Sequence, residues 1–231
     1  MLVLALETSE LAGSVALLNG DQVVQHVALD PTRRSAKWLA PAIDQILENA
    51  GRTPRDLQLI AVTTGPGSFT GLRVGVTTAK TLAYAVGCPV IGVNTLEAIA
   101  LRAAGMDKTL WAVIDAQRQQ LFAASFQKDD AGKLAVTQPT YIVTGDELLA
   151  TLAAGDMITG PGVATVQDRV TPGVAVADPG IWPARAIEVG LLGFAAFHAG
   201  RRDDLFLLVP QYFRPTAAEE QWSRKNTPPA A

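Results

Sequence analysis

Cysteine and histidine are scarce in this sequence, and their scarcity excludes several classes of protein. The 231-residue chain has one cysteine, Cys88, and two histidines, His26 and His198. A single cysteine cannot form an internal disulfide framework, and next to Pro89 it is typical of a small buried hydrophobe. The histidines are far apart in sequence and have no neighbouring ligand at metal spacing. We therefore expect structural roles for both, and no zinc or iron site.

Charge and long apolar runs are also limited. Charged residues make up 18% of the chain and the formal net charge is −3, which argues against strong autonomous nucleic-acid binding. The basic cluster of Arg33, Arg34 and Lys37 is more typical of a solvated surface than of a binding patch. No apolar run is long enough to span a bilayer, and the N-terminus has neither a basic leader nor a cleavage site. We expect a cytoplasmic protein with no membrane association.

With 48% hydrophobic residues, the chain can bury a sizeable core. The first half predicts the order β-β-β-α-β-α-β-α, with a hairpin turn at Asn19-Gly20-Asp21. Its strands are expected at 2–7, 13–18, 22–28, 57–64 and 89–93, and its helices at 35–50, 72–86 and from Thr95. The second half predicts strands at 110–114, 121–126, 157–159 and 211–213, a turn at 115–119, and helices at 144–153 and 183–199.

A glycine-rich stretch at 63–75 is the most informative part of the chain. It joins a strand to a helix, which is where a helix N-terminus can meet an anion or another backbone. Gly65 and Gly67 can adopt positive φ, and Ser68 or Thr70 can cap the helix. The stretch lacks the Gly-Lys-Ser/Thr of a P-loop, and its glycine spacing is wrong for a dinucleotide fingerprint. A well-capped turn with no ligand explains the same residues.

The helix after this loop carries a strip of small residues, Gly71, Gly75 and Ala79, beside the apolar Leu72 and Val76. Glycine within a helix costs about 1 kcal/mol relative to alanine, so Gly75 indicates that something packs very close. That neighbour is either the chain's own sheet or a helix of another chain. The preceding helix offers further apolar residues, and the two helices could form half of a four-helix interface. The residues it contributes are Leu39, Ile43, Ile46 and Leu47.

Polar residues at strand ends suggest a second site. Glu7 and Asp115 each end a predicted strand, and two such carboxylates could hold Mg²⁺ beside a phosphate. A residual nucleotide site would then combine Glu7, Thr8, Ser9, Gly65, Gly67, Ser68 and Asp115. Ordinary strand-end polar residues are the alternative, which we weigh more heavily. Ser68 lacks the surroundings of a nucleophile, and no catalytic residue is assigned.

Several motifs together resemble one family. They are Leu4-Ala5-Leu6-Glu7-Thr8-Ser9, Ser14-Val15-Ala16-Leu17, the string from Gly65 to Arg73, Gly92-Val93-Asn94-Thr95-Leu96, the turn from Asp115 to Arg118, and the late run from Pro210 to Arg214. In combination they resemble the bacterial TsaB (YeaZ) family, most densely over residues 1–120. Family members often have Asp at the position of Glu7 and His-Ser at the position of Arg34-Ser35.

The resemblance implies an α/β fold of the actin/Hsp70/sugar-kinase-like (ASKHA) type with two related lobes, the second reduced. The expected division is 1–102 for the N-terminal lobe, 103–226 for the C-terminal lobe, and 227–231 for a disordered tail. The resemblance also implies that the chain is a non-catalytic subunit. This subunit would pair, through the two helices above, with a larger TsaD-like catalytic paralogue. That complex would make N6-threonylcarbamoyladenosine (t6A) at position 37 of tRNA.

The implied assembly also includes a TsaE-like ATPase, and tRNA bound through the complex. This chain would need no cofactor itself, with ATP and Mg²⁺ used at the level of the complex, and by itself could form a homodimer. The alternative function is an ATP-binding or ATP-hydrolysing enzyme of the ASKHA superfamily, indicated by Glu7-Thr8-Ser9, Asp115 and the glycine turns. Under the leading interpretation, Gly75→Leu is expected to leave a folded monomer that no longer pairs.

Overall fold

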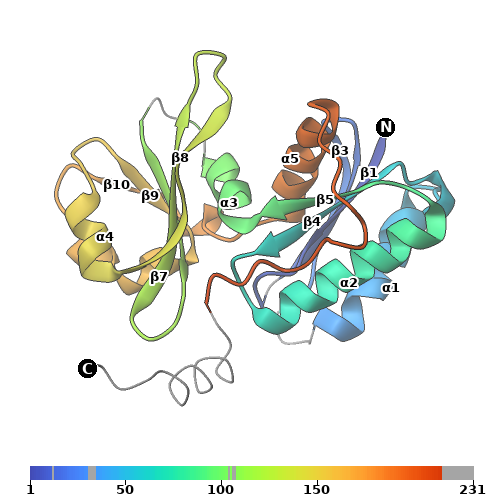
Figure 1. Cartoon of the computed structure of the whole chain (residues 1–231), viewed down its shortest axis with the longest axis horizontal. Coiled ribbons are helices and arrows are strands. Elements are labelled where there is room, and N and C mark those ends of the chain that lie inside the picture. Colours follow the sequence, from blue (N-terminus) through green and yellow to red (C-terminus); the bar gives the residue numbers. More distant parts are fainter. Residues whose placement is uncertain (12, 31–34, 104, 106–107, 215–231) are drawn as a thin grey trace, which may run out of the picture.

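A computed structural model describes residues 1–11, 13–30, 35–103, 105 and 108–214 of the chain. These residues form two α/β lobes side by side, each built on a five-stranded mixed sheet (Figure 1). The basic residues Arg33 and Arg34 and the predicted tail at 227–231 lie outside the described residues. None of the helices in the described ranges combines the length and the hydropathy of a membrane span.

The first sheet has the strand order β3-β2-β1-β4-β5. Strands β1, β2 and β3 form an antiparallel meander, whereas β4 and β5 run parallel to β1. The hairpin between β2 and β3 turns at Gly20-Asp21, as predicted. The bounds are β1 Leu2–Glu7, β2 Ser14–Asn19, β3 Gln22–Ala28, α1 Ser35–Asn49, η1 Pro54–Asp56, β4 Leu59–Gly65, α2 Phe69–Val86, β5 Val90–Asn94 and α3 Thr95–Ala103.

The second sheet has the order β8-β7-β6-β9-β10, with β6, β7 and β8 antiparallel and β9 and β10 parallel to β6. This is the first sheet's topology repeated, so the predicted α/β fold with two related lobes is confirmed. The bounds are β6 Leu110–Asp115, β7 Gln120–Lys128, β8 Leu134–Thr144, α4 Gly145–Thr151, β9 Met157–Thr159, η2 Pro161–Thr165, η3 Gln167–Arg169, β10 Ala175–Val176, η4 Pro179–Ile181 and α5 Ala186–His198.

The second lobe is reduced in its helices, as the resemblance implied. The crossover from β8 to β9 holds the seven-residue α4, where the first lobe has the fifteen-residue α1. The short 3-10 helices η2 and η3 stand where the first lobe has α2. The prediction of a strand at 211–213 is wrong, because this segment has no strand partner, and the sequence reading missed β8 and β10.

Alternation along the central strand decides which helices cover which face of the first sheet. Leu4 and Leu6 of β1 join the core beneath α1 and α2, whereas Val3 and Ala5 face the opposite core. Successive side chains of a strand point to opposite faces, so a strand buried on both faces reads as an unbroken apolar run.

The core on the face of the first sheet away from α1 and α2 also joins the two lobes. It contains Val3 and Leu59 of the first sheet, Leu110 and Phe126 of the second sheet, and residues of α3 and α5. Helix α5, near the end of the chain, packs on β1, β2 and β4 of the first lobe. Helix α3 packs on β6 of the second lobe and against α5 (Figure 1). The lobes are therefore joined on one side by shared packing, and the division at residue 102 stays a prediction.

Candidate functional site

A cleft of about 890 Å³ lies between the lobes. It opens at the edge where β1, β4 and β6 end, and the loops that follow these strands line it. In open α/β sheets this edge is where ligands usually bind. Its lining consists of Ser9, Glu10, Leu11, Pro66, Gly67, Ser68, Phe69, Ile114, Asp115, Ala116, Gln117, Arg118, Phe122, Pro161, Gln211, Tyr212, Phe213 and Arg214.

The glycine-rich loop forms one wall of the cleft by closing onto the loop after β1. The Ser68 amide donates a hydrogen bond of 2.6 Å to the carbonyl of Ser9. The Ser68 hydroxyl accepts from the Gly71 amide at 3.2 Å and so caps α2; of the two caps that the sequence offered, Ser68 and Thr70, Ser68 is the one. Gly67 has φ of 153°, and a Cβ there would lie 2.5 Å from the Ser9 carbonyl oxygen. Only glycine permits this conformation and this approach.

The two glycines of the small-residue strip on α2 face the same loop of the same chain. A Cβ at Gly71 would overlap the carbonyl oxygen of Thr8, and one at Gly75 would overlap the Thr8 hydroxyl. Of the two neighbours that the sequence left open, the one in contact with Gly75 therefore belongs to the same chain, at Thr8 directly after β1. A Gly75→Leu variant would disturb this chain's own packing, so the expectation that it leaves an intact monomer is wrong.

Glu7 is fully buried at the end of β1. Its Oε1 accepts hydrogen bonds from the Ser9 amide at 2.6 Å and from the Ser9 hydroxyl at 2.5 Å. Burial is the largest cause that raises the pKa of Glu7; the Ser9 hydrogen bonds lower this pKa, the nearby Glu10 carboxyl raises it, and the net value is about 8. The side chain is therefore mostly neutral at pH 7, when it does not offer the charge that a Mg²⁺ ligand needs.

The turn between β6 and β7 forms the facing wall of the cleft. Asp115 is exposed there, and its Oδ1 accepts from the Gln117 amide at 2.7 Å. Gln117, Arg118 and Gln119 have φ of 64°, 56° and 61°, so three consecutive non-glycine residues are left-handed. Each such residue costs roughly 1–2 kcal/mol, and neighbouring contacts must hold the turn in place.

The structure brings together only part of the predicted nucleotide site. Ser9, Gly67, Ser68 and Asp115 line the cleft, whereas Glu7, Thr8 and Gly65 do not. Among the described residues, no group of three or more His, Cys, Asp and Glu side chains is placed to hold a metal ion. Nucleotide binding by these residues stays a prediction.

Sequence reasoning missed the contribution of the C-terminal segment. Residues 211–214 all line the cleft, although none was among the predicted site residues. The sequence signal for this segment was the late run Pro210-Gln211-Tyr212-Phe213-Arg214, which served only as a motif of the family resemblance.

A second concave surface, the α1–α2 groove, lies on the outer side of the first lobe. It has a volume of about 430 Å³ and is lined by Ala40, Ile43, Asp44, Leu47, Pro54, Thr77, Thr78, Thr81, Leu82 and Ala85. Ile43 and Leu47 were predicted to contact a partner and form part of its lining. The other predicted partner residues lie in the chain's own core and do not line the groove: Leu39, Ile46, Gly71, Leu72, Gly75, Val76 and Ala79.

The chain is similar in sequence to a family model and to named relatives. The model of the family "TsaD: tRNA N6-adenosine threonylcarbamoyltransferase" matches residues 23–160. The tRNA threonylcarbamoyladenosine biosynthesis protein TsaB of Bacillus subtilis is 29% identical over 96% of this chain and 98% of its own. TsaB of Escherichia coli is 38% identical over 57% of this chain and 58% of its own.

A solved structure agrees with these sequence matches. YeaZ from Pseudomonas aeruginosa superposes with a TM-score of 0.80 at 27% identity, covering 91% of this chain and 99% of that one. Sequence and fold therefore agree over nearly the whole length. The chain belongs to the TsaB (YeaZ) family of tRNA threonylcarbamoyladenosine biosynthesis proteins, within the wider TsaD-like domain family.

Proposed function

We propose that this chain is a non-catalytic subunit that pairs with a TsaD-like catalytic paralogue for the threonylcarbamoylation of adenosine 37 in tRNA. The α1–α2 groove is the observation that carries the proposal. A groove between two surface helices that is lined by apolar and small side chains is a shape into which a helix of a second chain can pack.

The groove has the composition that helix packing needs. Ile43 and Leu47 lie at its base with exposed fractions of 7% and 2%, and Leu82 is half-buried beside them. Small exposed residues, Thr77, Thr81 and Ala85, follow one another along α2 at spacings of four residues. Such a row lets a second helix approach closely, as small residues do in other tight helix pairs.

The partner is proposed to be related to this chain, since the family model that matches residues 23–160 is that of TsaD. A related subunit would present an equivalent helix pair, so that four helices meet about a pseudo-two-fold axis. The TsaE-like ATPase and tRNA would join through this heterodimer, with ATP and Mg²⁺ used at the level of the complex. The same groove could pair two copies of this chain when the paralogue is missing.

The test is co-purification of the full chain with the TsaD-like protein of the same organism, with light scattering to count subunits. Thr81→Arg places a long charged side chain in the groove from an exposed position and should abolish the heterodimer. Ala150→Arg, on the exposed side of α4, makes the same chemical change away from the groove and should leave pairing intact. Heterodimers that form equally well with Thr81→Arg would refute the proposed interface.

The alternative, an ATP-binding or ATP-hydrolysing enzyme, predicts a different result. The isolated chain would then bind Mg²⁺-nucleotide in the interlobe cleft, and Asp115→Ala, which changes an exposed lining residue, would abolish that binding. Titration calorimetry of the isolated chain with ATP and Mg²⁺ measures this. Binding that Asp115→Ala removes, in a chain that forms no heterodimer, would favour the enzyme.

A further inference from the structure

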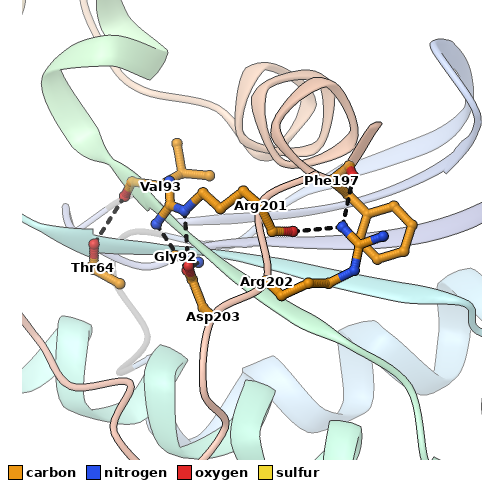
Figure 2. A network of polar contacts seen from close by, with 7 residues as sticks. All are labelled: Thr64, Gly92, Val93, Phe197, Arg201, Arg202 and Asp203. Atoms are coloured by element: carbon orange, nitrogen blue, oxygen red, sulfur yellow. Dashed lines mark hydrogen bonds and ion pairs between the residues drawn. The ribbon is translucent and has the colours of Figure 1, made fainter. Parts of the chain in front are cut away.

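The C-terminal segment of residues 201–214, here called the strap, crosses the first lobe and ends between the lobes. It starts just after α5, where the Asp203 carboxylate forms two 2.8 Å contacts with Arg201 and accepts from the Gly92 amide at 2.8 Å (Figure 2). Because β5 is the outer strand of its sheet, this contact fastens the strap to the sheet edge. The strap then follows α2 towards the cleft (Figure 1).

Along α2 the strap is held by one lysine and two leucines. The Lys80 ammonium donates to the carbonyl oxygens of Phe206 and Leu208 at 3.0 and 2.9 Å. Leu205 and Leu208 pack against the core beneath α1 and α2. These contacts attach the strap to α2 and to the core along its way to the cleft.

At the cleft, neighbouring strap residues attach to opposite lobes. The Gln211 amide donates to the Thr64 carbonyl of β4 at 2.7 Å. The Tyr212 ring lies 4.8 Å from the Phe69 ring at the start of α2, and its hydroxyl accepts from Arg73 Nε at 2.9 Å. Both of these attachments are to the first lobe.

The next two residues attach to the second lobe. The Phe213 ring lies 6.1 Å from the ring of Phe122 on β7. Arg214 donates to the Ala116 carbonyl at 2.5 Å and also to the Gln120 side chain. These partners flank the left-handed residues 117–119, so Arg214 forms hydrogen bonds with the turn on both sides of its left-handed residues.

We propose that residues 211–214 are a tie that sets the opening of the interlobe cleft, with Arg214 as the positioning residue for the β6–β7 turn. The lobes are joined by shared packing at α3 and α5, and the tie is a second attachment located at the cleft itself. Two attachments at separate places prevent the hinge rotation between the lobes that a single attachment would allow. The guanidinium fork suits this role, because it can bind two acceptors of the turn at once.

The tie also connects α2 with the second lobe. Phe69 and Arg73 belong to the first turns of α2, and α2 forms one wall of the α1–α2 groove. A partner seated in the groove would therefore be coupled to the β6–β7 turn through Tyr212 and Arg214. This consequence rests on the proposed function, whereas the tie itself does not.

The experiment measures the tie in the isolated full-length chain. Spin labels at Glu48→Cys on α1 and Ala150→Cys on α4, in a Cys88→Ala background, report the distance between the lobes by pulsed electron resonance. Hydrogen exchange followed by mass spectrometry reports the protection of amides 116–120. The parent should give one narrow distance distribution and a protected turn.

Arg214→Ala should broaden the distance distribution and speed exchange of the turn at least about tenfold, because it removes charge-assisted hydrogen bonds. Tyr212→Phe keeps the ring and removes only the hydrogen bond to Arg73, so it should broaden the distance distribution less. If Arg214→Ala fails to fold, Tyr212→Phe is the test instead, with a broadened distribution supporting the tie and a parent-like distribution overturning it. The matched control is Leu207→Ala, on the same strap with a side chain that is 76% exposed, which should match the parent. Parent-like distances and exchange in folded Arg214→Ala would overturn the tie, whatever the outcome of the pairing test.

Discussion

Gly75→Ala gives the most direct test of how the sequence encodes the packing beneath the cleft. Gly75 lies in the interior of α2, where alanine alone would favour the helix by about 1 kcal/mol. In this structure the added methyl group would overlap the hydroxyl of Thr8, whose side chain is fully buried. Overpacking of this kind costs about 1–3 kcal/mol. We place the clash near the upper end, because Thr8 has little room to move.

The expected net result is a loss of about 2 kcal/mol of unfolding free energy, since the clash outweighs the helix propensity. Thr8→Ala removes the atoms that clash, and the Thr8 hydroxyl has no hydrogen-bond partner among the described residues. The double variant should therefore recover most of the loss, with a coupling energy of about 2 kcal/mol in a double-mutant cycle.

Urea unfolding followed by circular dichroism measures all four members of the cycle. Gly105→Ala is the control, since no described atom lies within 4 Å of a Cβ at that position and φ is not left-handed. It should change stability by less than about 0.5 kcal/mol. A Gly75→Ala variant as stable as the parent, or a cycle without coupling, would refute the close approach of α2 to Thr8.

Two further predictions concern Glu7 and the cap of α4. Because burial raises the pKa of Glu7 from 4.5 to about 8, its contribution to stability is complete below pH 4.5 and is lost as pH rises to 8. The unfolding free energy of the parent relative to Glu7→Gln should fall by at most about 1.4 kcal/mol per pH unit across that window. A difference in unfolding free energy that does not change with pH would contradict the buried neutral carboxyl. Thr144→Ala should cost about 1 kcal/mol in a thermal or urea melt, because Thr144 and Glu147 form a reciprocal capping box, while Thr144→Ser should match the parent.

Local pattern was sufficient for much of the first lobe. The run from Leu2 to Glu7, the Gly20-Asp21 turn and the Ser68 cap each express a preference that acts within a few residues of sequence. The strand and the turn appear where they were predicted, and Ser68 caps α2, which begins at Phe69, three residues earlier than predicted. In the second lobe, β8 and β10 were missed, because a strand of mixed polarity and a strand of two residues have little periodicity to detect.

From the amino-acid pattern alone, α2 must meet something at close range, because glycine in a helix is unfavourable without such a neighbour. The identity of this neighbour, Thr8 of the same chain, follows from the folded contacts, and it moved the proposed interface from the buried Gly75 to the exposed Thr81. The same holds for Tyr212 and Arg214, whose partners lie 139 and 94 or more residues away along the chain. Contacts at such separations leave no local pattern, since they exist only once two lobes and a returning strap have come together.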